Sequence, residues 1–194
     1  MDVYELIISI LFLLWGLSEL ILIYTRRAKR VIKKINDWTL WVQCVGVFIS
    51  VLLGLTWRSY DEIRPSGIFF TGNNREMFFV AVFLLLVGLV IRWHAILQLK
   101  QWFSTTITIQ EGQQVLSDGI YKFIRHPSYS GVMLCFLAVA LSFHTFFLFL
   151  VVFLPNLLAM LIRISFEEKI LIEHFGKEYI EYKQHSKKLI PWLF

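Results

Sequence analysis

The side chains that could do chemistry gather in two short segments of the 194-residue chain. Residues 118–131 read DGIYKFIRHPSYSG, which combines a turn, an Arg-His-Pro triplet and two tyrosines. After a long uncharged stretch, residues 163–168 read RISFEE. On a helix, Arg163 and Glu167 are neighbours on one face. A planar guanidinium suits a carboxylate, and tyrosine rings suit a cation, so these residue types are suited to binding an ionised organic ligand.

The composition predicts that lipid, rather than water, surrounds most of the chain. Hydrophobic residues make up 57% of it and charged residues 17%, and the mean hydropathy is +0.65. A soluble domain has about 45–50% apolar and about 25% charged residues. These values exclude a soluble globular domain and a disordered chain. Cys44 and Cys135 lie in apolar runs, so the sequence predicts no disulfide framework, no zinc site and no other metal.

Three apolar runs in the N-terminal half predict membrane spans. They cover residues 3–24, about 38–57 and about 77–99, and about 20 apolar residues suffice to cross a bilayer. The first run is not typical of a cleavable signal peptide. Its leading end carries Asp2 and Glu5, and no small-residue cleavage site follows it.

The C-terminal half predicts a helical hairpin. Residues 131–162 are uncharged, which is too long for one span and short for two. We therefore expect a tight hairpin with its turn at residues 142–145 and its first arm starting at Pro127. The second arm should pass Pro155 and continue as one charged helix toward Pro191.

The expected fold class is thus all-α: a polytopic membrane protein with five transmembrane helices and a C-terminal cytoplasmic helix. Residues 1–194 form one integral membrane domain, with three spans in 1–99 and a catalytic region in 100–194. This topology places 15 of the 19 Lys and Arg residues on the inner side, as the positive-inside rule requires. The active site then faces the cytosol and the N-terminus lies opposite, in the cell membrane of a prokaryote or the endoplasmic reticulum of a eukaryote. The basic bias reflects topology and contact with anionic lipid rather than nucleic acid.

The order of the motifs resembles one family of membrane enzymes. The chain reads GxYxxxRHPxYxG from Gly119, then a hydrophobic hairpin, then RxxxEE from Arg163 and FGxEYxxY from Phe175. This arrangement is similar to that of the isoprenylcysteine carboxyl methyltransferases, integral membrane enzymes that use S-adenosylmethionine. The resemblance covers roughly residues 113–191, while the N-terminal spans match only as generic hydrophobic helices. The short chain suits a compact, prokaryotic type of member.

The resemblance implies a site for S-adenosylmethionine, with S-adenosylhomocysteine as the product. It places Glu167 against the cofactor and Arg163 against the substrate, as the two catalytic residues. The other residues that it assigns to the cofactor are Gln113, Gln114, Val115, Leu116, Tyr121, His126, Pro127, Ser128 and Tyr129.

The implied reaction is methyl transfer to the α-carboxylate of a farnesyl- or geranylgeranyl-cysteine, carried by a lipid-like molecule or a protein C-terminus. The product is a methyl ester at the boundary between membrane and cytosol. Because an α-carboxyl group has a pKa of about 3.5, the acceptor is already ionised and needs no general base. The reaction needs alignment and partial removal of water from the nucleophile.

Several of these charged residues have structural alternatives. Arg163 and Glu167 could form an ion pair at the end of a membrane helix. Arg125 taken alone is typical of a contact with lipid phosphate. Arg92 could reach the site or extend along the span to the interface, and Glu19 could lie at the inner interface or pair with a basic residue.

Three other functions compete with carboxyl methylation. The first is methylation of another lipid, such as a phospholipid amine, although an amine suits a negative site better than it suits Arg163. The second is a sterol or enone reductase that uses NADPH, whose relatives share the RHPxYxG region but differ in the later motif, where this chain has Glu167-Glu168-Lys169-Ile170. The third is a channel or membrane scaffold, which would leave the polar loop and Arg163 unexplained.

Overall fold

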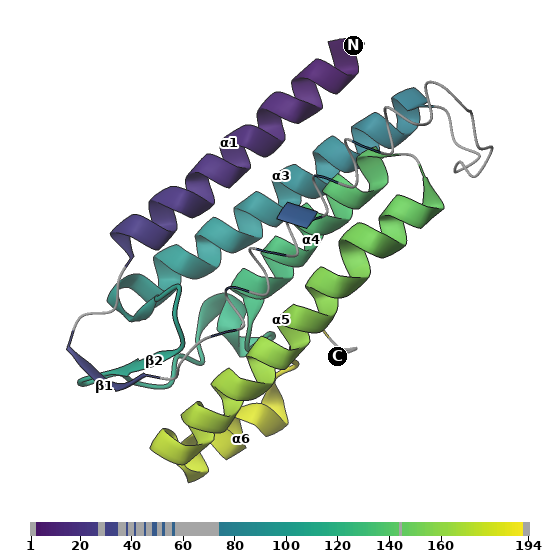
Figure 1. Cartoon of the computed structure of the whole chain (residues 1–194). Helices are drawn as coiled ribbons and strands as arrows, with labels where there is room; N and C mark the ends of the chain where they lie inside the picture. Colours follow the sequence, from purple (N-terminus) through teal and green to yellow (C-terminus); the bar gives the residue numbers. More distant parts are fainter. Residues whose placement is uncertain are drawn as a thin grey trace.

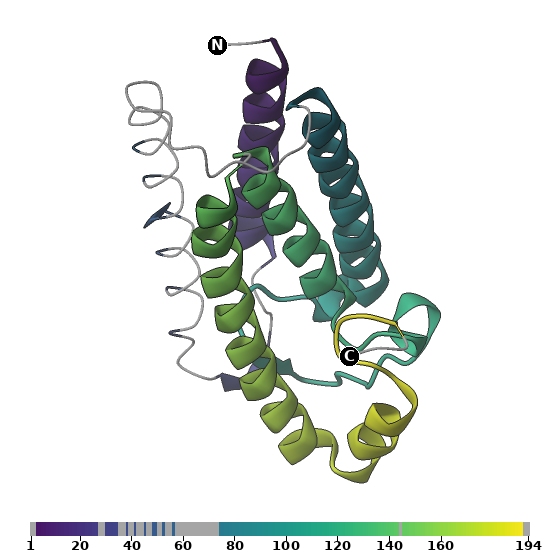
Figure 2. The same cartoon turned by 90° about the vertical axis from the view of Figure 1, so that its right-hand side faces the viewer.

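The protein is described from a computed structural model of the chain, shown in Figure 1. The structure describes residues 3–26, 30–34, 74–143 and 145–191, together with isolated positions between residues 38 and 56. The described helices run alongside one another as a bundle, and short strands and a short helix gather at one end of it (Figures 1 and 2).

The predicted first and third spans are confirmed as helices. Helix α1 covers Val3–Thr25 and helix α3 covers Asn74–Leu99. Both consist almost entirely of apolar residues, and both are long and apolar enough to cross a membrane. Most of α1 is exposed, because it lies at the rim of the bundle and contacts its neighbours along one stripe, where Ile8 lies in a cluster with Phe78 of α3.

Two further helices complete the bundle. Helix α4 covers Pro127–Ser142, and Pro127 stands in its first turn, where the missing N–H leaves no helical bond unmade. Helix α5 covers Phe146–Phe175 and continues through Pro155. The two helices lie side by side, and Met133 and Phe136 of α4 pack against Met160 and Ile164 of α5.

The number of membrane spans stays a prediction. Helices α1, α3 and α5 each contain a segment that could cross a membrane, and their presence makes this an integral membrane protein. Helix α4 is shorter, at 16 residues. The predicted second span at residues 38–57 lies outside the described residues apart from isolated positions.

Helices α3 and α4 approach each other closely at two glycines. A Cβ atom at Gly88 would lie 2.6 Å from the carbonyl oxygen of Gly131, and one at Gly131 would lie 2.5 Å from that of Gly88. Only hydrogen side chains permit this approach, which is how small residues bring membrane helices together. The crossing fixes the N-terminal half of α4 against the middle of α3.

The prediction of one continuous charged helix after Pro155 is wrong at Gly176. Helix α5 ends at Phe175, Gly176 adopts φ +58°, and helix α6 covers Lys177–His185. A positive φ is the usual signature of a glycine at a helix end. The break lets α6 fold back beneath the bundle (Figure 2).

A two-stranded sheet adds to the predicted all-helical fold. Strand β1 (Val31–Lys34) pairs antiparallel with strand β2 (Thr108–Gln110), with Lys34 opposite Thr108 and Val31 opposite Gln110. The β-branched run before and within β2, TTITI, is the sequence signal for a strand. The pairing joins the segment after α1 to the segment after α3.

Candidate active site

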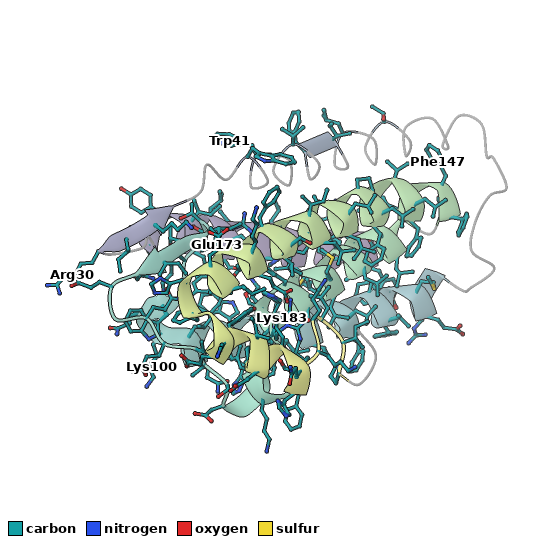
Figure 3. The ribbon with its side chains drawn as sticks, turned by 90° about the horizontal axis from the view of Figure 1, so that it is seen from below. Arg30, Trp41, Lys100, Phe147, Glu173 and Lys183 are labelled. Carbon is teal, nitrogen blue, oxygen red and sulfur yellow. The ribbon has the colours of Figure 1, made fainter. Side chains whose placement is uncertain are left out.

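The predicted site residues lie at one end of the bundle. The end of α3 leads through a short helix, η1 (Lys100–Trp102), to β2, and a second short helix, η2 (Gly119–Lys122), precedes α4. The second half of α5 and the whole of α6 lie at the same end. In Figure 3, Lys100, Glu173 and Lys183 mark this end and Phe147 marks the opposite end.

Three of the predicted residues form one chain of hydrogen bonds. The Nε atom of Arg163 donates to Tyr129 Oη at 3.0 Å, and Tyr129 Oη donates to Glu167 Oε2 at 2.6 Å. The Arg163 guanidinium also lies 5.9 Å from the centre of the Tyr129 ring. The structure thus brings Arg163, Glu167 and Tyr129 together, with a tyrosine hydroxyl between the cation and the carboxylate.

The backbone holds Arg163 from a second side. Its Nη2 atom donates to the carbonyl oxygen of Thr105 at 2.6 Å, in the segment between η1 and β2. Arg163 is 3% exposed. A buried guanidinium that is already hydrogen-bonded has a fixed direction, and such preorganisation is what recognition of a carboxylate requires.

Tyr121 is fixed by three segments. Its hydroxyl donates to the carbonyl oxygen of Ala95 on α3 at 3.2 Å, and its own carbonyl accepts from Tyr182 Oη on α6 at 2.7 Å. Burial, and then the negative charge of Glu167, raise the pKa of Tyr121 well above its usual range. Tyr121 therefore stays a neutral hydrogen-bond donor at physiological pH.

The turn before Tyr121 requires a glycine and a glutamine. Gly119 adopts φ +56°, which non-glycine residues rarely adopt. Gln98 of α3 clamps this turn, because its Nε2 atom donates to the carbonyl oxygen of Asp118 at 2.8 Å and its Oε1 atom accepts from the Ile120 amide at 3.3 Å. Sequence reasoning did not find Gln98, since a glutamine at the end of a membrane helix carries no distinctive signal.

Glu168, to which the sequence assigned no role, binds three basic side chains. Its carboxylate lies 2.8 Å from Arg125 Nε, 2.9 Å from Lys183 Nζ and 3.4 Å from His126 Nε2. These contacts tie α5 to α6 and to the segment before α4. The interpretation of Arg125 as a lipid-phosphate contact is wrong, because its guanidinium is buried against Glu168 and also donates to the carbonyl oxygens of Lys183 and Ser186.

The remaining predicted cofactor residues surround this core. The His126 ring stacks on the Tyr129 ring with 5.6 Å between centres, and both Pro127 and Ser128 are buried in the first turn of α4. Gln113 closes the turn after β2, because its side-chain oxygen accepts from the Gln110 amide at 3.0 Å. Gln114 is exposed, and Val115 and Leu116 are half-buried. Their role toward a cofactor stays a prediction.

A second ion pair lies deeper in the bundle. Arg92 of α3 binds Glu19 of α1 through both carboxylate oxygens, at 2.7 Å and 2.6 Å. The expectation that Glu19 pairs with a basic residue is confirmed. Arg92 is 7% exposed, so it points into the bundle rather than along the span toward the interface.

These side chains can hold a charged organic ligand. Glu167 offers a carboxylate to a cationic group, and the stacked rings of His126 and Tyr129 and the buried ring of Tyr121 offer aromatic faces. Arg163 offers a guanidinium to an anionic group. A site with both charges and aromatic surface suits a zwitterionic ligand with a flat ring.

The fold and this site define an integral membrane protein whose polar site lies at one end of a helical bundle. A solved structure of the eukaryotic intramembrane Ras methyltransferase, an isoprenylcysteine carboxyl methyltransferase, has the same fold. It superposes with a TM-score of 0.59 at 19% sequence identity, and the match covers 82% of this chain and 55% of that one.

The sequence comparisons point to the same group. Residues 80–173 match the model of the isoprenylcysteine carboxyl methyltransferase family. The chain is 29% identical over 139 residues to protein-S-isoprenylcysteine O-methyltransferase B of Arabidopsis thaliana, which covers 65% of this chain and 66% of the plant protein. The chain is therefore similar to the isoprenylcysteine carboxyl methyltransferase family, most clearly over residues 80–173.

A bacterial relative matches over a shorter stretch. The chain is 40% identical over 73 residues to methanethiol S-methyltransferase 1 of Bradyrhizobium diazoefficiens, which is 38% of this chain and 25% of that protein. The chain thus spans a quarter of the bacterial relative and 66% of the plant one.

Proposed function

We propose that this protein transfers a methyl group from S-adenosylmethionine to the α-carboxylate of a prenylated cysteine, forming a methyl ester. The observation that carries the proposal is the buried guanidinium of Arg163, held by Tyr129 and Thr105 beside the Glu167 carboxylate. The match of residues 80–173 to the model of the isoprenylcysteine carboxyl methyltransferase family supports the same reaction class.

The residues present fit the cofactor. S-adenosylmethionine, when bound, supplies a methyl group activated on a sulfonium. Glu167 would balance the positive charge of the cofactor, and the rings of Tyr121, His126 and Tyr129 would contact its adenine and sulfonium. The hydrogen bond from Tyr129 orients the Glu167 carboxylate.

The residues also fit an ionised acceptor. Arg163 would bind the acceptor carboxylate and hold one of its oxygens in line for reaction, which is a positioning effect. Because the carboxylate is already ionised, the chain has no proton to remove. Burial of Arg163 excludes water, which strengthens its attraction to a carboxylate. The acceptor is a greasy molecule, so it would reach the site from the lipid, and the cofactor would enter from the cytosol.

The named function of the bacterial relatives favours a second candidate, S-methylation of a thiol. Two methanethiol S-methyltransferases of Bradyrhizobium diazoefficiens match this chain at 40% and 35% identity. A thiol has a pKa of about 8.5, so it must lose a proton, and Glu167 is the carboxylate placed to accept it. This reaction needs no guanidinium, so the buried Arg163 favours the carboxylate acceptor.

A methyl-transfer assay with radiolabelled S-adenosylmethionine tests the proposal. The purified protein is offered a farnesylcysteine analogue, its geranylgeranyl counterpart, a phospholipid amine, a sterol and a small thiol. We expect label in the prenylcysteine ester and binding of S-adenosylhomocysteine. Label only in the thiol supports the second candidate, and NADPH binding without methyl transfer to any acceptor overturns both.

A further inference from the structure

The buried guanidinium of Arg92 lies on a candidate membrane-spanning helix and joins three helices. Its Nε and Nη2 atoms donate to Glu19 of α1, and its Nη1 atom donates to Ser128 Oγ in the first turn of α4 at 2.6 Å. The guanidinium also lies 5.8 Å from the centre of the Phe103 ring. Each nitrogen atom of the Arg92 guanidinium therefore has a described hydrogen-bond partner.

A buried charge is costly unless it is paired. Glu19 pairs with both of the nitrogens that face it, and its own side chain is 24% exposed, whereas that of Arg92 is 8% exposed. The bidentate geometry reduces the cost of removing the ions from water, but an apolar pair of similar volume is often no less stable. Packing stability alone is therefore a weak reason for this pair, and intramembrane ionisable residues are usually functional.

The partners of Arg92 are the neighbours of the groups that hold Arg163. Ser128 directly precedes Tyr129, whose hydroxyl accepts from Arg163 Nε. Phe103 lies two residues before Thr105, and the carbonyl oxygen of Thr105 accepts from Arg163 Nη2. Arg92 thus contacts both chain segments between which the Arg163 guanidinium is held.

We propose that Arg92 is a positioning residue, which sets the two acceptors of Arg163, Tyr129 Oη and Thr105 O, through Ser128 and Phe103. Glu19 serves as the counter-ion that allows Arg92 to be buried. The effect on catalysis rests on the proposed carboxyl methylation. The effect of Arg92 on the positions of the segments that contain Thr105 and Tyr129 does not depend on that function.

Two variants weaken the connection from Arg92 to α4, and both keep a positive charge beside Glu19. Ser128→Ala removes the hydroxyl that accepts from Arg92. Arg92→Lys keeps the positive charge but lacks the planar guanidinium that binds Glu19 and Ser128 together. We expect each to raise the KM for the prenylcysteine acceptor or lower kcat by about tenfold, because small displacements of positioning groups have effects of this order or larger. The double variant should be no worse than Arg92→Lys alone, since both act on one interaction.

Glu19→Gln and Lys33→Gln distinguish a role of Arg92 in positioning the acceptors of Arg163 from a role in the stability of the fold. Glu19→Gln weakens the charge pair but leaves Arg92 bonded to Ser128, so it should lower the thermal midpoint more than it changes KM. Lys33→Gln breaks an exposed ion pair with Glu173, away from Arg92, and should change neither. If Ser128→Ala and Arg92→Lys lower the thermal midpoint while kcat and KM stay at wild-type values, Arg92 is only structural and the proposal is overturned.

Hydrogen exchange provides a readout that does not depend on activity. In Ser128→Ala, the amides of residues 103–106 and 128–131 should exchange faster than in wild type, whereas Lys33→Gln should leave them unchanged. Faster exchange in a protein that methylates no acceptor would overturn the proposed function and retain the role of Arg92. Unchanged exchange in Ser128→Ala overturns the role of Arg92 whatever the assay shows.

Discussion

Arg163 is oriented before any ligand binds, because a tyrosine hydroxyl and a backbone carbonyl hold it from two sides. The entropic cost of orienting the Arg163 guanidinium therefore arises largely during folding rather than during ligand binding. This arrangement also explains why Tyr129 and Thr105 matter at the scale of single residues. Under the proposed function, Tyr129 and Thr105 would affect binding of the acceptor through Arg163 without contacting the acceptor themselves.

Arg163→Ala should abolish most acceptor methylation while retaining the cofactor site. We expect kcat/KM for the prenylcysteine analogue to fall at least about 100-fold, as for the loss of one aimed donor in a buried site. Binding of S-adenosylhomocysteine, measured by calorimetry, should change little. Lys169→Ala, at an exposed position on the same helix, is the matched control. Unchanged turnover in Arg163→Ala would remove this residue from the acceptor site.

Two glutamates on α5 offer a direct contrast between a buried and an exposed carboxylate. Glu168→Gln would remove the counter-ion that Arg125 and Lys183 share among the described residues, and breaking a buried pair costs about 3–5 kcal/mol. We expect a lower thermal midpoint and faster proteolysis near α6. Glu173→Gln breaks only the exposed pair with Lys33 and should leave both measurements near wild type. Equal effects of the two substitutions would show that Glu168 does not hold α6.

At the scale of helices, the approach of α3 to α4 determines where the site residues lie. The crossing at Gly88 and Gly131 brings Arg92 within reach of Ser128, and η2, which precedes α4, is bonded to the same helix through Tyr121 and the carbonyl oxygen of Ala95. Any increase in the distance between these helices would therefore displace the candidate site residues of η2 and of the start of α4 as well as the core.

Gly88→Ala and Gly131→Ala should separate α3 from α4. A Cβ atom at either position meets backbone atoms closer than 3 Å, and overpacking of this kind costs about 1–3 kcal/mol. Gly16→Ala in α1 is the matched control, because a Cβ atom there has no neighbour within 4 Å. Its higher helix propensity should leave stability unchanged or slightly raised. Thermal unfolding in detergent measures all three, and equal midpoints would contradict the tight crossing.

The helices were predictable where composition alone determines them. Long apolar runs specified α1 and α3, because a membrane helix satisfies its own backbone and needs only length. The end of α5 was not predictable, because the charged pattern continues across Gly176 and a glycine within a helical pattern does not by itself announce a positive φ. Strand β1 was missed because its partner β2 lies more than seventy residues away, and its basic residues matched a topological signal.

The candidate site was predictable to a similar degree. The motif spacing brought Arg163, Glu167 and Tyr129 into one group, and the structure joins them by hydrogen bonds. Gln98 and Glu168 act through contacts between distant segments, so no local pattern marks Gln98, and the RxxxEE motif contains Glu168 without indicating its partners. The sequence predicted a basic partner as one alternative for Glu19, but it did not identify Arg92 as that partner, because the two residues lie in different apolar runs.

At the scale of the whole molecule, the polar groups lie at one end and the opposite end carries the start of α3. Cysteines introduced at Lys187 and Arg30 should therefore react with an impermeant reagent from the same side of a vesicle, and a cysteine at Glu76 from the other. The background is Cys44→Ala with Cys135→Ala. The positive-inside rule predicts the cytosolic side for the first two. Labelling of all three from one side would contradict the transmembrane arrangement of α3.

The first 34 residues supply two things that a generic membrane anchor does not: the counter-ion of Arg92 and the partner strand of β2. A chimera in which an unrelated apolar helix replaces them would still enter the bilayer, yet its site would lack both. The N-terminal helix and the half of the chain that carries the candidate site should consequently be inherited together. Recombination between relatives should conserve the pair Glu19 and Arg92 as a unit, even where the lipid-facing residues of α1 are freely exchanged.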